Sequence, residues 1–188
     1  RRPARPASKR NFIDTMPNLR PIYIALGSNV GDRAAMLARA IEEMKRAGLR
    51  VLRRSSLYET EPVGGPPQPW FLNAVVEAET ELTLQRVLHA LQEIERAMGR
   101  QRSVVRGPRT LDLDILFDGE CVAHSGELEV PHPRLAQRRF VLAPLAELAP
   151  QLIHPVLHKT VAELLAETSD GAQVRLWKPG NERAERER

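Results

Sequence analysis

Two hydrophobic periodicities alternate along residues 21 to 118, and this alternation limits the folds that the chain can adopt. Apolar side chains recur at every second position in four segments, as in strands, and at helical spacing in two others. The pattern predicts strands near 22–26, 51–58, 71–78 and 111–117, and helices over 33–47 and 84–98. We therefore expect the β-α-β-β-α-β order of the ferredoxin-like plan, an α+β class with an antiparallel sheet, two helices on one face and the other face free for a ligand.

Local signals define where these elements begin and end. Asp32 and Thr83 are suitable helix N-caps, and Gly48 and Gly99 close the same two helices. Asp118-Gly119 is a hairpin signal that predicts another short strand. A C-terminal extension follows, with an apolar segment at 144–148, a helix opened by a capping box from Thr160 to Glu163, and an edge strand at 174–177.

Charge is distributed unevenly along the 188 residues. Residues 1–20 are rich in proline and arginine and carry a net charge of +5, which predicts a disordered basic tail, whereas the rest of the chain carries −1. A nearly neutral body does not favour the basic stripe that general binding of nucleic acids needs. Residues 21–177 form the expected single domain, and a charged flexible tail is expected at 178–188.

Cysteine content and hydropathy restrict the compartment. Cys121 is the single cysteine, which excludes an internal disulfide framework and a cysteine-rich zinc site. The sequence has no apolar run of the length that spans a bilayer and no signal-peptide pattern. We therefore expect a cytoplasmic protein that does not insert into membranes.

An acidic pair occupies the fourth predicted strand, in the motif Gly107-Pro108-Arg109-Thr110-Leu111-Asp112-Leu113-Asp114-Ile115-Leu116-Phe117. Strand parity predicts one face made of Leu111, Leu113, Ile115 and Phe117, and a second face that holds both aspartates, roughly 7 Å apart at Cα. Carboxylates at this separation repel each other and raise a pKa unless cations lie between them. The pair suits Mg²⁺, which takes one or two carboxylates together with water and phosphate oxygens. The alternative is a solvated strand face without a ligand.

Four arginines crowd the segment before and at the start of this motif: Arg100, Arg102, Arg106 and Arg109. Guanidinium forks match phosphate oxygens in pairs. Metal ions held by carboxylates, together with arginines on the remaining oxygens, are how proteins hold a triphosphate. The combination predicts a site that handles phosphates.

Two further polar positions are candidates for the same cavity. Glu95 falls near the middle of the apolar stripe of the second helix, where an unpaired carboxylate is costly. Either the helix end projects beyond the core and Glu95 is solvated, or Glu95 lines the cavity and orients an arginine or accepts from a ligand hydroxyl. His132, between two prolines, either shapes a turn or folds with Arg138 over the aspartate strand toward a phosphate chain.

A third group combines Thr60, the proline-rich loop 61–69, and the pair Phe71 and Asn73. Phe71 and Asn73 share a strand face by parity. An aromatic ring stacks on a flat heterocycle, and an amide offers it a donor and an acceptor. These residues are either ordinary core residues or the walls of an acceptor pocket.

Five motifs carry a resemblance to a known family: Tyr23-Ile24-Ala25-Leu26-Gly27-Ser28-Asn29, Tyr58-x-Thr60, Phe71-Leu72-Asn73-Ala74, Gly107-Pro108-Arg109-Thr110-Leu111-Asp112-Leu113-Asp114-Ile115 and Val130-Pro131-His132. In this order, and over residues 21–177, they resemble 6-hydroxymethyl-7,8-dihydropterin pyrophosphokinase of folate biosynthesis. The resemblance implies a ferredoxin-like fold. It also implies transfer of the terminal pyrophosphoryl group of ATP to the pterin hydroxymethyl group, with release of AMP.

The resemblance also implies a role for individual residues. Asp112 and Asp114 would hold two Mg²⁺ ions with ATP, and Arg100 and Arg109 would act on the triphosphate as catalytic arginines. The implied ATP site further contains Gln92, Glu95, Ile115, His132 and Arg138. The implied pterin pocket contains Thr60, Val63, Phe71, Asn73 and Phe140, with the two phenylalanines on either side of the ring. No obligate protein partner is implied.

The chain departs from the family pattern at two positions. Arg106 stands where the family often has an aromatic residue just before Gly-Pro-Arg, and Pro133 stands where some members have an aromatic residue. Both positions concern how the loops close over the substrates rather than the reaction itself.

Two other classes of function stay open. A nucleotidyltransferase or nuclease would use the same two-metal chemistry on nucleic acid, although the neutral body and the aromatic-amide pocket argue against it. A ferredoxin-like regulatory module without catalysis would leave Arg109, Glu95 and His132 unexplained.

Overall fold

The computed structural model describes residues 19–100, 107–126 and 128–179. The first part of the chain contains β1 (Arg20–Ser28), α1 (Arg33–Arg46), β2 (Arg50–Arg54), β3 (Tyr58–Thr60), β4 (Phe71–Thr80), α2 (Leu84–Ala97) and β5 (Asp112–Asp118). The second part contains β6 (Ala123–Ser125), β7 (Leu128–Val130), a 3-10 helix (Leu135–Gln137), α3 (Arg139–Leu148), α4 (Val161–Glu167) and β8 (Val174–Leu176). The predicted α+β class is confirmed.

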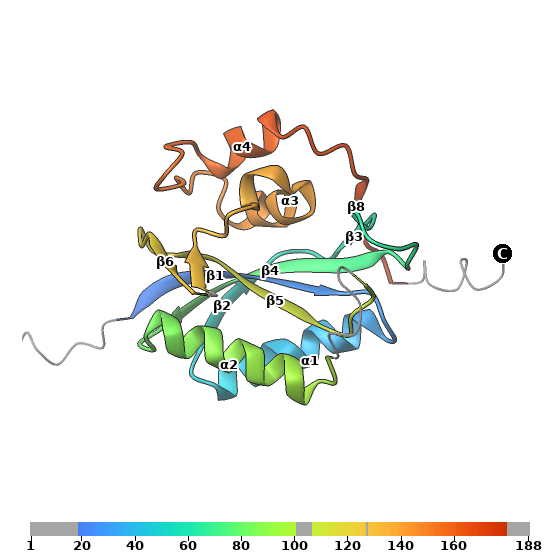
Figure 1. Cartoon of the computed structure of the whole chain (residues 1–188), viewed down its shortest axis with the longest axis horizontal. Helices are drawn as coiled ribbons and strands as arrows, with labels where there is room; N and C mark the ends of the chain where they lie inside the picture. Colours follow the sequence, from blue (N-terminus) through green and yellow to red (C-terminus); the bar gives the residue numbers. More distant parts are fainter. Residues whose placement is uncertain (1–18, 101–106, 127, 180–188) are drawn as a thin grey trace, which may run out of the picture.

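The main sheet is antiparallel and has the strand order β5-β1-β4-β3-β8, with β2 also paired to β4 (Figure 1). The edge strand expected at 174–177 is confirmed as β8. The hairpin signal at Asp118-Gly119 is followed by β6, which pairs with β7 in a small separate sheet. The centre of the main sheet is therefore β4, which pairs with β1, β2 and β3, and β5 forms one edge.

The single strand expected over 51–58 is wrong, because the segment is broken into β2 and β3. Between them, the backbone N–H of Ser55 donates to the Val75 carbonyl, while the Ser55 hydroxyl accepts from the Val75 N–H at 3.0 Å. A side-chain oxygen thus replaces a ladder carbonyl. The backbone leaves the sheet ladder at Ser56, whose N–H donates to Glu147 of α3 instead.

One sheet face is covered by α1 and α2, as predicted (Figure 1). The side chains of Asp32 and Thr83 accept hydrogen bonds from Ala35 and Arg86 and cap these helices. Every second residue of the central strands points into this core, including Ile24 of β1. Burial of these apolar faces is the main source of stability in this layer.

The other sheet face is not free, contrary to the prediction, because α3 packs on part of it and α4 packs on α3 (Figure 1). Tyr23, Val75 and Phe117, one from each central strand, lie in this second core with the apolar faces of the two helices. Farther along the same strands, Gly27, Asn73 and Asp112 line a pocket instead. Each central strand therefore contributes one segment to a core and one to the pocket.

A bulge in β5 corrects the predicted face of Phe117. The register between β1 and β5 shifts so that Tyr23 is opposite Phe117 while Ile24 is opposite Ile115, which leaves Leu116 as an extra residue. Phe117 consequently packs on the α3 side, edge-on to Tyr23, rather than with Leu113 and Ile115.

The first boundary of the domain also differs from the expected one. Arg20 was expected in the basic tail but begins β1, where its guanidinium pairs with Asp118 at 2.5 Å. The remaining tail residues 1–18, and residues 180–188 at the other end, lie outside the described residues. Within the described ranges, no helix has both the length and the apolar character needed to cross a bilayer.

The capping box predicted from Thr160 to Glu163 is confirmed at the start of α4. We expect Thr160→Ala to lower the free energy of unfolding by about 1 kcal/mol, because the Glu163 N–H loses its acceptor. Thermal or denaturant unfolding measures the change. Glu163→Gln is the matched control, since glutamine preserves the return bond to Thr160 and should cost less. Equal losses in the two variants would assign the effect to charge instead.

Candidate active site

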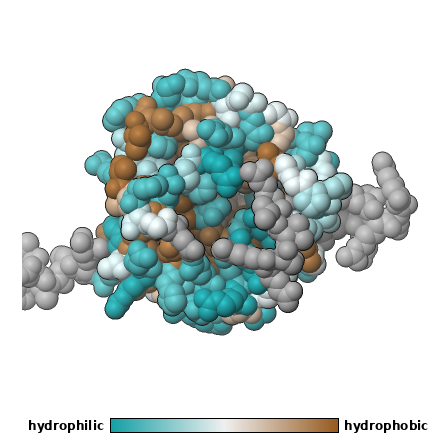
Figure 2. Space-filling view, viewed as in Figure 1, coloured by the Kyte–Doolittle hydropathy of each residue, from teal (hydrophilic) through white to brown (hydrophobic). Residues whose placement is uncertain are grey.

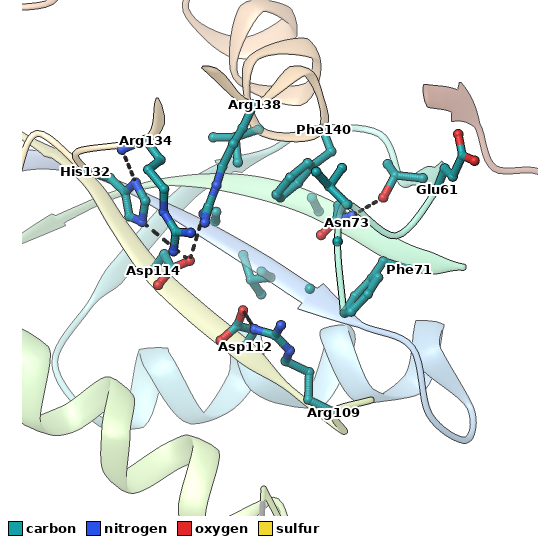
Figure 3. Close-up of a pocket in the computed structure, with 18 of the residues that line it drawn as sticks. Glu61, Phe71, Asn73, Arg109, Asp112, Asp114, His132, Arg134, Arg138 and Phe140 are labelled. Carbon is teal, nitrogen blue, oxygen red and sulfur yellow. Dashed lines mark hydrogen bonds and ion pairs between the residues drawn. The ribbon is translucent and has the colours of Figure 1, made fainter. Parts of the chain in front are cut away.

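A pocket of about 680 Å³ opens on the sheet face that carries α3. Its floor comes from β1, β4 and β5, and its upper wall comes from Arg138, Phe140 and Val141 at the start of α3 (Figure 3). Figure 2 shows that the molecule is mostly hydrophilic on this side, with a hollow near the middle of the view. The volume is sufficient for a small-molecule ligand.

Asp112 and Asp114 are the first and third residues of β5, and both point into the pocket, as parity predicted. Asp112 forms ion pairs with Arg100 at 2.8 Å and with Arg109 at 2.5 Å. Arg138 lies 3.9 Å from an Asp114 oxygen. The Asp114 side chain remains partly open to the pocket, but desolvation by the neighbouring walls, followed by repulsion from Asp112, raises its pKa to about 6. The strand thus holds two carboxylates side by side with three guanidinium groups around them.

Glu95 of α2 lies behind this pair and is 5% exposed. Its carboxylate accepts from the Leu113 N–H at 2.7 Å and contacts the Arg100 guanidinium. Burial raises the pKa of Glu95 to about 7, against the lowering effects of Arg100 and of the Leu113 amide. Of the two readings of Glu95, the structure favours the one in which it orients an arginine, and the side chain does not itself line the pocket.

His132 faces the same carboxylates from the opposite wall. Its Nδ1 accepts from the Arg134 N–H at 3.1 Å, and its Nε2 lies 4.0 Å from Asp114 (Figure 3). Burial, followed by the charges of Arg138 and Arg134, lowers the pKa of His132 to about 4. The imidazole is therefore neutral near pH 7, with its proton on Nε2, so it serves as a hydrogen-bond donor to the pocket rather than as a cation.

The other end of the pocket has aromatic and amide walls. The rings of Phe71 and Phe140 come from β4 and α3 and lie on two sides of the space beside Asn73 (Figure 3). The Asn73 amide donates to the Thr60 hydroxyl at 2.6 Å, which fixes its orientation. Gly27 gives this amide room, because a Cβ there would lie 2.7 Å from Asn73 Oδ1. Val63 completes the wall.

Asn29 organises the site, a role that no sequence pattern indicates. Its Oδ1 accepts from the Arg109 N–H at 2.8 Å, and its Nδ2 donates to Gln68 and to the Pro69 carbonyl at 3.0 Å. Asn29 therefore ties the turn after β1 both to the arginine segment and to the proline-rich loop. These partners are distant along the chain, so periodicity cannot reveal them.

The structure brings most of the predicted residues together; besides Glu95, two of them do not line the pocket. Ile115 packs in the core under α1 and α2, and Gln92 of α2 does not line the pocket. Arg102 and Arg106 lie outside the described residues, and Pro133 is exposed. Glu61 and Gln68, which also line the pocket, belong to the candidate loop 61–69, whereas the lining residues Arg134 and Gln137 were assigned no role from the sequence.

A search against protein families matches residues 23–150 to 7,8-dihydro-6-hydroxymethylpterin-pyrophosphokinase, abbreviated HPPK. The chain belongs to the HPPK family. One HPPK relative, the 2-amino-4-hydroxy-6-hydroxymethyldihydropteridine pyrophosphokinase of Methylorubrum extorquens, is 47% identical over 146 residues, which cover 77% of this chain and 90% of the relative. The protein of the same name from Bacillus subtilis is 44% identical, over 83% of this chain and 89% of the relative.

Other HPPK relatives are longer proteins. The Folic acid synthesis protein fol1 of Pneumocystis carinii is 39% identical over 87% of this chain, but the chain spans only 22% of that relative. Among solved structures, wild-type HPPK-DHPS of Plasmodium falciparum has a TM-score of 0.65 at 15% identity, over 81% of this chain and 45% of that one. At this identity, the structural match supports the ferredoxin-like HPPK fold alone.

Proposed function

We propose that the chain transfers the terminal pyrophosphoryl group of ATP to the hydroxymethyl group of 6-hydroxymethyl-7,8-dihydropterin, with AMP and the pterin diphosphate as products. The observation that carries this proposal is one pocket with two different ends. Asp112 and Asp114 lie among arginines at one end, whereas Phe71, Phe140 and Asn73 form the other (Figure 3). A phosphate donor and a flat acceptor fit side by side in such a space.

The acceptor end suits a pterin. Phe71 and Phe140 would stack on the two faces of the ring, while the Asn73 amide would bond its polar edge. The Thr60 bond holds that amide in one orientation, which a ligand with a fixed donor and acceptor pattern requires. Thr60 and Val63 would border the ring.

The acidic pair fits two Mg²⁺ ions bound with ATP. Among the residues that the structure describes, no cluster of three or more His, Cys, Asp or Glu could hold a metal by itself. Two carboxylates are nevertheless what Mg²⁺ takes when phosphate oxygens and water complete its octahedron. The raised pKa of Asp114 fits the same proposal, because cations would relieve its repulsion from Asp112. When bound, the ions supply charge neutralisation and acidify a coordinated hydroxyl group.

The chain's own residues would bind and orient the reactants. Arg100 and Arg109 would exchange the Asp112 carboxylate for phosphate oxygens, and Arg138 and the Nε2–H of His132 would contact the phosphates from the far wall. Glu95 would hold Arg100 in place. The hydroxymethyl oxygen would then attack the β-phosphorus. The bond between the β-phosphorus and the oxygen that bridges the α- and β-phosphates would break, and the hydroxyl proton would be released to water.

The remaining expectations stay predictions. The described residues carry both signs of charge at the pocket, in keeping with a small anionic substrate rather than a nucleic acid. One of them is a cytoplasmic location; among the relatives, a protein of Arabidopsis thaliana is named a mitochondrial folate synthesis bifunctional protein.

A product assay tests the proposal. The chain is incubated with ATP, Mg²⁺ and 6-hydroxymethyl-7,8-dihydropterin, and the nucleotides and pterins are separated. We expect AMP and the pterin diphosphate in equal amounts, formed only when all three components are present. ADP with a pterin monophosphate would reject pyrophosphoryl transfer, and cleavage or extension of a nucleic acid in a parallel tube would favour the nucleotidyltransferase or nuclease class.

A further inference from the structure

We propose that Arg134 is a further nucleotide-binding residue, whose guanidinium binds the α-phosphate of ATP, the phosphate that leaves in AMP. The inference rests on the proposed function and concerns one contact within it. Arg134 lines the pocket, and its side chain reaches toward Asp114 beside Arg138 and His132 (Figure 3).

The direction of the reaction places the α-phosphate at this end. An in-line displacement at the β-phosphorus puts the attacking oxygen and the leaving oxygen on opposite sides. The pterin oxygen would approach from the wall made by Phe71 and Phe140, and the aspartates lie between that wall and His132 (Figure 3). The leaving α-phosphate therefore faces the wall that carries His132 and Arg134.

The backbone around Arg134 is held in place, so its side chain starts from a fixed position. The Arg134 N–H donates to His132 Nδ1 at 3.1 Å, and the Arg134 carbonyl accepts from the Gln137 N–H at 3.2 Å. The next residue, Leu135, is 0% exposed and packs in the core under α3. Ligand binding would thus cost little conformational entropy in this segment, because only the Arg134 side chain remains to be ordered.

The charge of Arg134 is available to a ligand. Arg100, Arg109 and Arg138 each face Asp112 or Asp114, whereas the guanidinium of Arg134 forms no ion pair with any carboxylate of the described residues. Burial is the main cause of the lowered pKa of both His132 and Arg138, and the nearby positive charge of Arg134 adds to each. An exposed cation that raises the local positive potential, and that pairs with no carboxylate in the described part of the chain, suits an anionic ligand.

AMP is the probe, because it carries the α-phosphate alone. We expect Arg134→Ala to weaken AMP binding about tenfold in titration calorimetry with Mg²⁺ present, the size expected for one hydrogen bond to a charged group. The KM for the pterin should stay unchanged. Arg134→Lys should bind AMP with an affinity between those of the parent chain and Arg134→Ala, because lysine retains the positive charge but lacks the two parallel N–H donors of the guanidinium.

Arg139→Ala is the matched control, since Arg139 is also exposed, lies five residues farther along, and does not line the pocket. It should leave AMP binding within about twofold, since an exposed charge outside the pocket is screened by salt. Equal weakening of AMP binding by the two variants would overturn the assignment, and the effect would then come from the overall positive electrostatic potential of this surface. A higher pterin KM with unchanged AMP binding would move Arg134 to the acceptor end. Failure of the parent chain to form AMP from ATP would reject the proposed function, while the AMP titration would still report on Arg134.

Discussion

Asp114→Ala is expected to lower kcat by about a thousandfold or more, because under the proposed mechanism the loss of one of the two carboxylates that would hold Mg²⁺ removes about 4 kcal/mol of transition-state stabilisation. The carboxylate lies on the pocket floor between Asp112 and the far wall. Asp112 is the other acidic residue of β5 that lines the pocket. Steady-state release of AMP at saturating ATP and pterin measures the loss.

The same variant separates a metal role from a structural one. Burial and Asp112 raise the pKa of Asp114, so the ionised group is disfavoured in the metal-free fold. Its removal should therefore leave the melting temperature of the metal-free protein unchanged or higher. The rise in melting temperature that Mg²⁺ and ATP give the parent chain should be lost. Retained turnover, or a collapsed fold, would remove this carboxylate from the proposed mechanism.

Arg109→Ala should lower kcat about a hundredfold, because a guanidinium aimed at developing phosphate charge contributes on this scale. Arg109 pairs with Asp112 at 2.5 Å, and its guanidinium lies 5.6 Å from the Phe71 ring centroid. It therefore stands at the junction of the donor and acceptor ends. Initial rates with each substrate varied in turn measure kcat and both KM values.

Arg109→Lys is the internal control for this position. Lysine retains the positive charge but cannot present two parallel N–H groups to a phosphate, so an intermediate kcat is expected. A variant that raised only the pterin KM, with kcat intact, would show that Arg109 acts through Phe71 as a wall of the acceptor pocket.

Local patterns were sufficient where neighbouring residues decide the structure. Alternation along β5 placed Asp112 and Asp114 on one face because parity depends only on the strand itself. The N-caps of α1 and α2 were predictable for the same reason, since each cap bonds an amide three residues away. Glu95 was detectable because a carboxylate interrupts an apolar stripe.

Long-range contacts explain what the sequence did not reveal. Asn29 has partners 39 and 80 residues away, so no local pattern marks it. Phe117 changes face because β5 and β1 share a bulge, which depends on both strands. The helix α3 contains Pro144, a residue that argues against a helix interior, and packing of its apolar face overrides that preference.

Because α3 and α4 cover only part of one sheet face, residues on the same strand are selected either for stability or for activity. Residues such as Val75 and Phe117 hold the layers together, whereas Asn73 and Asp114, on the same strands, face the pocket. A substitution under α3 should mainly change the free energy of unfolding, and a substitution in the pocket should mainly change the turnover rate. Catalytic performance and robustness can therefore evolve as nearly independent traits along single strands.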